Sequence, residues 1–444
     1  MNYIPHTDND RERMLEAIGV GRVAELFEDI PKKVRLGRPL DLPPGMSELE
    51  VYSLLYGLSK KNLNLNDCVS FLGAGVYDHF IPAVVDHVIS RSELYTAYTP
   101  YQPEVSQAVL QIIYEYQTAI CELTGMDVSN ASHYDGSTAA AEAAIIAAMH
   151  TGRRKAVVSE AVHPEYRRTI NTYAHGYGIE VTEIPCSGGV TDWSRAPEAM
   201  SGAATLIVQN PNFFGCLEEL QSAERAAHGA GALFTVIVDP ISLGVLRPPG
   251  DYGADIVVGE GQSLGNAPSF GGPYLGIFAV KSPLVRRLPG RVIGMTRDNR
   301  GQRGFVMTLQ TREQHIRREK ATSNICSNEA LCAAAALVYM TTMGKQGMRE
   351  VGELCTAKSH YLAGRLAEVG YRPAFQAPFF KEFAVRCPVE PESIVTRLAG
   401  EGILAGYPLG RAYPQFRDCL LIAVTEKRTR SEMDTFVARL EGLK

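Results

Sequence analysis

Short apolar runs alternate with amphipathic stretches through the middle of the chain. The runs are KAVVSE (155–160), IEVTEIP (179–185), TLIVQN (205–210), LFTVIVDP (233–240), ADIVVGE (254–260) and PYLGIFAV (273–280). Each run has the length of a strand, and the segments between them have helical spacing. Strands that alternate with helices indicate a mostly parallel sheet that is covered on both faces. We therefore predict one large α/β domain over residues 66–328.

Helical spacing is clearest at the two ends of this region. In PEVSQAVLQIIYEYQTAICELTG, apolar side chains recur every three or four residues, Pro103 suits the first helical turn and Gly125 suits the C-cap. SNEALCAAAALVYMTTMGKQG (327–347) predicts a long helix. The strand-like runs EFAVRCP and CLLIAVTE follow it among helical segments. We predict that residues 329–444 form this long helix and a smaller C-terminal α+β domain.

Residues 1–65 are predicted to form a polar, helical arm. The run TDNDRERMLEAIG begins with capping residues and stops at Gly19, LGRPLDLPPG is a turn-rich linker, and SELEVYSLLYGLSKKN resumes helical spacing. An arm of this length has little core of its own. It either packs on the body of the protein or wraps around a partner, and we favour the second interpretation.

Composition and charge narrow the class of protein. The 444 residues are 45% hydrophobic and 21% charged, as in soluble globular proteins of two or three structural units. The net charge of −5 gives no reason to expect binding to nucleic acid or to an anionic membrane, and no apolar run is long enough to span a bilayer. Nine cysteines without a C-x-x-C pair favour reduced thiols over disulfides or a metal site. We expect a cytoplasmic protein.

Three features could hold a phosphorylated, flat cofactor. Gly136, Ser137 and Thr138 stand at a helix start, where free N–H groups attract phosphate, although the same residues make a good N-cap. His163 follows a strand, so it lies at the sheet edge where ligands of α/β proteins collect. It could stack on a cofactor ring or simply hydrogen-bond a loop. Asp239 ends another strand and could keep a pyridinium nitrogen protonated, or cap a turn.

The order of these features is the layout of fold-type-I pyridoxal-phosphate enzymes, with one residue missing. No lysine occurs between Asp239 and Val280, and Gln262 or Ser263 stands where the Schiff-base lysine is expected. A glutamine amide is not a nucleophilic amine and cannot replace it. Lys281 and Lys320 are the nearest alternatives. The constellation therefore indicates the fold and argues against independent catalysis.

Two further segments are candidates for a binding site. ELYTAYTPYQPEVSQA places several rings and polar groups just before a helix; they could line a pocket for a small polar substrate or brace a loop. The candidates are Tyr95, Tyr98, Tyr101, Gln102 and Glu104. In ATSNICSN, a polar cluster precedes the long helix and could cap it or donate to a phosphate. These residues are Thr322, Ser323 and Asn324.

Long motifs resemble the alpha (subunit 1) chains of the glycine cleavage system P-protein family. They are FLGAGVYDHFIPAVV, YTAYTPYQPEVSQ, YDGSTAAAEA, VVGEGQSLG with FGGPYLG, and GMTRDNRGQRGFVMTLQTREQHIRREKATSNIC. They occur in order over about residues 71–327.

The resemblance implies a fold-type-I chain that lacks the lysine and completes a site at an interface. A beta subunit would bind pyridoxal phosphate covalently, the assembly would be an α2β2 heterotetramer, and the reaction would be decarboxylation of glycine with aminomethyl transfer to the lipoyl arm of H-protein. On this interpretation the Tyr95–Glu104 segment reaches toward glycine or lipoyl, and residues 322–324 help to hold the cofactor phosphate in trans. We interpret the ancestral site residues as structural; these are Ser137, Thr138, His163, Asp239 and Gln262.

Two alternatives remain open on the sequence. One is a self-sufficient enzyme that uses Lys281 or Lys320 as the Schiff-base lysine. The other is a non-catalytic scaffold that only stabilises a partner chain. The first predicts that the isolated chain retains the cofactor. The second predicts that the candidate pockets can be mutated without any effect on chemistry.

Overall fold

The computed structural model describes residues 5–321, 323–325 and 327–443, and it divides into two compact units, residues 1–62 and 63–444. The first unit is the arm. Helix α1 (Asp8–Ile18) starts with a capping box between Thr7 and Asp10, and α2 (Glu48–Ser59) starts with one between Ser47 and Glu50. None of residues 5–62 is buried. The arm therefore has no core of its own.

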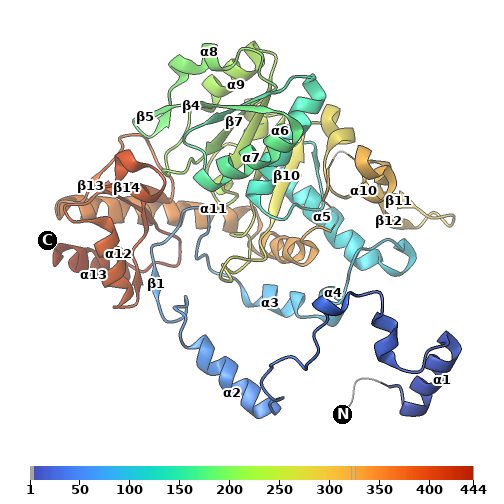
Figure 1. Cartoon of the computed structure of the whole chain (residues 1–444). Coiled ribbons are helices and arrows are strands. Elements are labelled where there is room, and N and C mark those ends of the chain that lie inside the picture. The colour runs from blue at the N-terminus through green and yellow to red at the C-terminus, as the bar shows by residue number, and fades with distance from the viewer. Residues whose placement is uncertain (1–4, 322, 326, 444) are drawn as a thin grey trace. The chain divides into compact units, whose positions relative to one another are not determined.

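The second unit is built around a seven-stranded sheet of order β2-β10-β9-β8-β7-β3-β4 (Figure 1). The strands are β2 (Val128–Ser129), β3 (Lys155–Ser159), β4 (Glu180–Ile184), β7 (Thr205–Asn210), β8 (Leu233–Val238), β9 (Ile256–Glu260) and β10 (Gly276–Val280). The five strands from β4 to β9 are parallel, and β10 runs antiparallel to both β9 and β2. The predicted α/β fold with a mostly parallel sheet is confirmed.

Helices cover both faces of this sheet. On one face lie α6 (Gly136–Thr151) and α7 (Pro164–Tyr177), which share a core with alternate strand residues such as Val158 and Ile207. The other face packs against α5 (Gln107–Thr124), α9 (Leu220–Gly229) and the first half of α11 (Ala330–Glu368), through residues such as Leu206 and Val236. Because both faces are buried, the central strands β7, β8 and β9 are almost continuously apolar, which is why these runs were visible in the sequence. The edge strand β4 is more polar and more exposed.

The C-terminal layer is an antiparallel sheet of order β13-β14-β17-β16, formed by β13 (Arg372–Pro373), β14 (Glu382–Arg386), β16 (Tyr407–Pro408) and β17 (Cys419–Ala423). It packs against α12 (Pro391–Ala399), α13 (Arg430–Glu441) and the second half of α11, which is interrupted at Gly344. Strand β1 (Val69–Ser70) pairs with β15 (Ile403–Leu404), so the chain crosses this layer before it enters α3 (Ala83–Ile89).

Smaller elements complete the second unit. They are α4 (Ser92–Tyr95), α8 (Ala196–Ala199), α10 (Gln314–Arg317), the pair β5 (Cys186–Ser187) and β6 (Val190–Thr191), and the hairpin β11 (Val292–Arg297) and β12 (Arg303–Thr308). Among the described residues, no helix combines the length and the apolar character needed to cross a membrane.

Candidate functional site

The carboxyl edge of the parallel strands brings together three of the candidate residues. His163 follows β3, Asp239 follows β8 and Gln262 follows β9, and all three line one cavity. This cavity has a volume of about 30 Å³, which is room for one or two water molecules. Small-molecule pockets usually have volumes of roughly 300–1,000 Å³. The protein's own side chains therefore fill the sheet edge.

A lysine from the C-terminal layer enters this cavity. Lys381 directly precedes β14 and is 1% exposed. Its Nζ lies 2.7 Å from Oδ2 of Asp239, 2.8 Å from Nε2 of His79 and 3.7 Å from the centre of the Tyr77 ring. Sequence reasoning missed this residue, because a single lysine between Phe380 and an apolar strand gives no sign of a partner so far away in the chain.

Gln262, one of the two residues that stand where a lysine was expected, holds a loop in place. Its Oε1 accepts a hydrogen bond from the backbone N–H of Tyr77 at 3.0 Å, and its Nε2 donates to the backbone oxygens of Tyr77 at 3.2 Å and Asn266 at 2.6 Å. The side chain is 1% exposed, so these hydrogen bonds satisfy an amide that would otherwise be buried without partners. Ser263 is also buried and lines the same cavity.

Two carboxyl groups occupy the N-terminus of α6, where a phosphate could bind. Oδ1 of Asp135 accepts from the backbone N–H groups of Ser137 at 2.7 Å and Thr138 at 2.9 Å, and from the Ser137 hydroxyl at 2.6 Å. Oε2 of Glu260 accepts from the N–H of Gly136 at 3.0 Å. Burial raises the pKa of Glu260 to about 8, against the N–H donors that favour its charged form. The helix end is therefore already capped.

His163 is held in a neutral, structural state. It is the N-cap of α7, where Nδ1 accepts from the backbone N–H of Glu165 at 3.1 Å, so Nε2 carries the proton and donates to the Ala74 carbonyl at 2.9 Å. Burial lowers the pKa of His163. The centre of the His163 ring lies 4.7 Å from the centre of the Phe213 ring, which it meets edge-on, and 5.1 Å from the centre of the Tyr166 ring. Its ring nitrogens thus hold the start of α7 and the loop that contains Ala74.

The tyrosine-rich segment lies at the surface and reaches the segment before α11. Tyr95, Tyr98 and Tyr101 are 57%, 78% and 48% exposed, and Gln102 and Glu104 are exposed too. The Tyr98 hydroxyl accepts a hydrogen bond from Ser327 Oγ at 3.1 Å. The fold therefore brings together the two segments proposed as binding candidates.

A second cavity, with a volume of about 650 Å³, opens beside these segments. It is lined by Tyr101, Arg291, Glu313, Gln314, His315, Arg318, Glu319, Asn324 and Ile325. Of the candidates, Tyr101 and Asn324 lie in it, whereas the Ser323 hydroxyl is buried and donates to Glu142 at 2.7 Å. Thr322 lies outside the described residues. We name this space the Tyr101–Asn324 cavity.

A buried arginine is among the charged residues that line this cavity. Arg291 is 3% exposed, its guanidinium carbon lies 5.6 Å from the centre of the Tyr101 ring, and its Nε has no hydrogen-bond partner. Its nearest acidic neighbour is Glu313, whose Oε2 is 3.9 Å away and whose Oε1 is also without a hydrogen-bond partner. Unsatisfied buried donors and acceptors of this kind can be satisfied by a polar ligand. Nothing in the sequence around Arg291 marked it.

Neither alternative lysine lies in the sheet-edge cavity. Lys281 follows the antiparallel strand β10, which places it at the opposite edge, where its Nζ donates to the Gly125 carbonyl at 2.9 Å. Lys320 is exposed in a short helical turn. The structure therefore gives no support to a self-sufficient site built on either residue.

Comparison with known proteins identifies the family. A family model described as glycine cleavage system P-protein matches residues 1–440. Over 446 residues, which cover both chains completely, the protein is 54% identical to the probable glycine dehydrogenase (decarboxylating) subunit 1 of Moorella thermoacetica. The chain belongs to the glycine cleavage system P-protein family. It is also 54% identical, over 443 residues and the full length of both chains, to the probable glycine dehydrogenase (decarboxylating) subunit 1 of Carboxydothermus hydrogenoformans.

Solved structures agree with the P-protein assignment. A crystal structure of glycine decarboxylase (P-protein) of the glycine cleavage system, in inhibitor-bound form, is 44% identical with a TM-score of 0.91, and each chain is covered completely. A sphingosine-1-phosphate lyase from Burkholderia pseudomallei shares 13% identity, with a TM-score of 0.67 over 93% of this chain and 94% of that chain. The second likeness shows the fold alone, which is of the fold-type-I class.

The sheet edge of this P-protein chain does not fit pyridoxal phosphate. No lysine stands in the loop after β9, Lys381 already neutralises Asp239, and Asp135 with Glu260 occupies the helix end that would receive the phosphate. The remaining space of about 30 Å³ is also too small for the cofactor ring. The Tyr101–Asn324 cavity has the volume that the sheet edge lacks, and its lining residues Arg291 and Glu313 carry polar atoms without hydrogen-bond partners.

Proposed function

We propose that this chain is the alpha subunit of a glycine-cleavage P-protein. With a beta subunit that carries pyridoxal phosphate on a lysine, it decarboxylates glycine, releases CO2 and transfers the aminomethyl group to the lipoyl arm of H-protein. The observation that carries the proposal is the closed sheet edge, where no lysine stands in the loop after β9 and Lys381 is already paired with Asp239. Such an edge leaves the chain dependent on a second subunit for the chemistry. The names of the relatives, each a subunit 1, support the same division of labour.

The Tyr101–Asn324 cavity supports a role in trans. Tyr101 and Asn324 offer a hydroxyl and an amide, and the buried Arg291 offers a guanidinium with a free N–H. A guanidinium held in a partly dry cavity attracts carboxylate or phosphate groups. In our proposal the Tyr95–Glu104 segment faces the glycine or lipoyl end of the beta-subunit site. Asn324 helps to hold the cofactor phosphate, whereas the Ser323 hydroxyl already donates to Glu142.

The arm supports the existence of a partner. Many large apolar side chains of residues 5–62 are exposed, and those on α2 include Leu49, Tyr52, Leu55 and Tyr56 at 75%, 68%, 58% and 54% exposure. Apolar groups gathered in one segment are typical of an interaction surface. We propose that the arm wraps the beta subunit in an α2β2 heterotetramer.

Reconstitution tests the proposal. The purified chain, a beta subunit of the same family, and their mixture are each assayed for glycine-dependent CO2 release with lipoylated H-protein. We expect activity in the mixture alone. Activity in the isolated chain would contradict the proposal, and full activity of the beta subunit alone would favour a scaffold or a dispensable role.

A further inference from the structure

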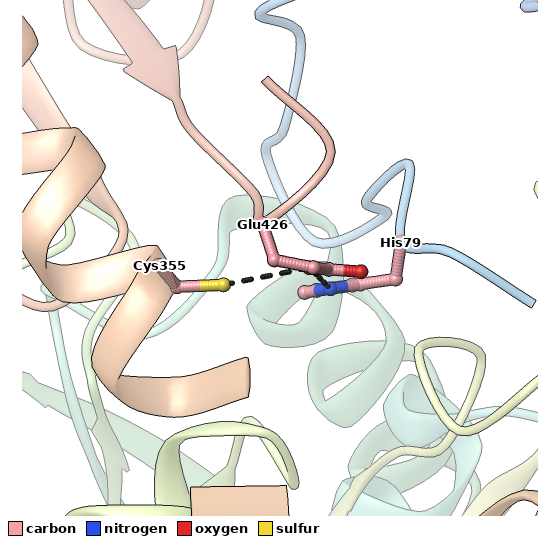
Figure 2. Close-up of side chains that lie close together, drawn as sticks. All are labelled: His79, Cys355 and Glu426. Carbon is pink, nitrogen blue, oxygen red and sulfur yellow. Dashed lines mark hydrogen bonds and ion pairs between the residues drawn. The ribbon is translucent and has the colours of Figure 1, made fainter. Parts of the chain in front are cut away.

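An ion pair and hydrogen bonds connect Asp239 to a group of polar side chains in and beside the C-terminal layer. Lys381 bridges Asp239 to His79, whose Nδ1 lies 2.6 Å from Oε2 of Glu426. The thiol of Cys355 approaches the same oxygen at 3.6 Å, as Figure 2 shows. The chain of contacts joins the end of β8, the segment after β1, helix α11 and the turn after β17.

Protonation of this network follows from its donors. Because Lys381 donates to Nε2 of His79, the imidazole carries its proton on Nδ1 and donates it to Glu426. Burial lowers the pKa of His79, and Lys381 lowers it further. Burial opposes the charge on Glu426, but the His79 hydrogen bond holds the pKa of Glu426 at about 2. The network therefore consists of the Asp239–Lys381 ion pair, then the neutral imidazole of His79, then the carboxylate of Glu426.

This arrangement holds Lys381 and leaves no free metal ligand. His79, Cys355 and Glu426 are residue types that bind zinc, and their ligand atoms lie within 4.8 Å of one another. The Nδ1 proton, however, lies between His79 and Glu426, and it cannot move to Nε2 while Lys381 donates there. Burial also raises the pKa of Cys355, which keeps it a thiol. The cluster acts as a hydrogen-bonded support for the lysine.

We infer that Lys381 is a built-in substitute for the cofactor ring. Its ammonium pairs with Asp239 as a protonated pyridinium nitrogen would, while the Glu260 carboxyl takes the N–H group of Gly136 that a phosphate would use. The chain thus excludes pyridoxal phosphate from its own sheet edge even when a lysine stands at position 262. This inference concerns the chain's own site and stands whether or not the role beside a beta subunit is right.

Lys381 and its neighbour Glu382 also hold the C-terminal layer against the large sheet. Lys381 comes from that layer, and its neighbour Glu382 accepts hydrogen bonds from the Ala74 backbone N–H at 2.7 Å and the Tyr77 hydroxyl at 2.8 Å. Both side chains are buried. The start of β14 therefore contacts both the 74–79 segment and the large sheet. These contacts keep the sheet edge closed.

Restoring the lysine tests the exclusion directly. Full-length Gln262→Lys, Gln262→Lys/Lys381→Met and Gln262→Lys/Lys381→Met/Glu260→Ser are incubated with pyridoxal phosphate, reduced with borohydride and analysed for label at position 262 by mass spectrometry. We expect background labelling in the single variant and at least a tenfold rise across the series. Gln262→Lys/Lys155→Met is the matched control and should stay at background. Stoichiometric labelling of the single variant, or a folded triple variant that labels no better than the single, overturns the inference.

Comparison of single and double substitutions separates the loss of the Lys381–Asp239 pairing from general destabilisation of the fold. Lys381→Met leaves the partly buried Asp239 carboxylate without its ion-pair partner, and Asp239→Asn leaves the buried Lys381 ammonium without its partner. Lys381→Met/Asp239→Asn leaves neither charge. We expect the double variant to melt at a higher temperature than either single variant. Additive losses in melting temperature would show that the two charges do not depend on each other, and would overturn the proposed pairing.

Discussion

The hydroxyl of Tyr98 accepts a hydrogen bond from the Oγ of Ser327 at 3.1 Å, which joins two segments that are far apart in the sequence. Both segments were candidates for binding on sequence grounds alone. Their meeting beside the Tyr101–Asn324 cavity gives the proposed trans site one location, and it makes the individual side chains testable.

The tyrosine hydroxyls should matter for turnover. We expect Tyr98→Phe and Tyr101→Phe to lower glycine-dependent kcat/KM of the reconstituted complex by roughly 3- to 10-fold each, which is the effect of one lost hydrogen bond of about 0.7–1.4 kcal/mol. Tyr177→Phe, on a tyrosine that lines neither cavity, is the control. Unchanged turnover in Tyr95→Phe/Tyr98→Phe would remove this segment from the site.

Asn324 should affect the cofactor more than glycine. In our account, Asn324→Ala weakens retention of pyridoxal phosphate by the assembled complex several-fold, and Thr322→Val/Asn324→Ala weakens it further, because donors to the phosphate are lost. The measurement is the cofactor dissociation constant of the α–β complex. Asn171→Ala, on the exposed side of α7, should have no effect. Equal cofactor affinity in all variants would contradict the phosphate assignment.

Glu142 should make the stability of the chain depend on pH. Burial raises its pKa from 4.5 to about 7, so between these values the folded state binds more protons than the unfolded state. The free energy of unfolding contributed by this group therefore falls as pH rises from about 4.5 to 7, by about 2–3 kcal/mol, and is constant above.

Glu142→Gln isolates this contribution. Its amide oxygen can still accept the hydrogen bond from Ser323 that Oε1 of Glu142 accepts at 2.7 Å. Chemical denaturation at several pH values should show that the difference between variant and wild type grows through this window in favour of the variant. A difference that is independent of pH would show that Glu142 is ionised throughout.

The arm should contribute to assembly and not to the stability of the isolated chain. Tyr52→Glu/Leu55→Glu changes two exposed side chains of α2, so we expect the melting temperature of the isolated chain to stay within about 2 °C. Affinity for the beta subunit should fall at least tenfold by sedimentation or light scattering. Leu354→Glu, an exposed leucine on α11, serves as the control. Normal assembly of the arm variant would refute the wrapping proposal.

The fold was largely predictable because its sheet is buried on both faces. That burial makes β3, β7 and β8 almost continuously apolar, and their carboxyl ends necessarily place His163 and Asp239 at one edge. The antiparallel direction of β10 was not visible, since an apolar run carries no sign of direction. The contact between Lys381 and Asp239 was hidden for a different reason: it joins two layers whose packing is set by the whole core.

The candidate site was only partly predictable. Tyr101 and Asn324 carry polar groups in turn-rich segments, which is a local signal that sequence analysis can detect. Arg291 directly precedes the hairpin strand β11 and looks like an ordinary surface charge until the fold buries it against Tyr101 and Glu313. The capping of the α6 N-terminus by Asp135 and Glu260 was ambiguous as well. Gly-Ser-Thr at a helix start suits a bound phosphate and a carboxylate cap equally.

Borohydride trapping of the assembled complex tests the central claim most directly. The chain and its beta subunit are mixed with pyridoxal phosphate, reduced, separated and digested, and the pyridoxyl-lysine peptide is identified by mass spectrometry. Our account predicts stoichiometric label on one lysine of the beta subunit and none above background on this chain, alone or in the complex. Stoichiometric label on a lysine of this chain, such as Lys281, Lys320 or Lys381, would contradict the account.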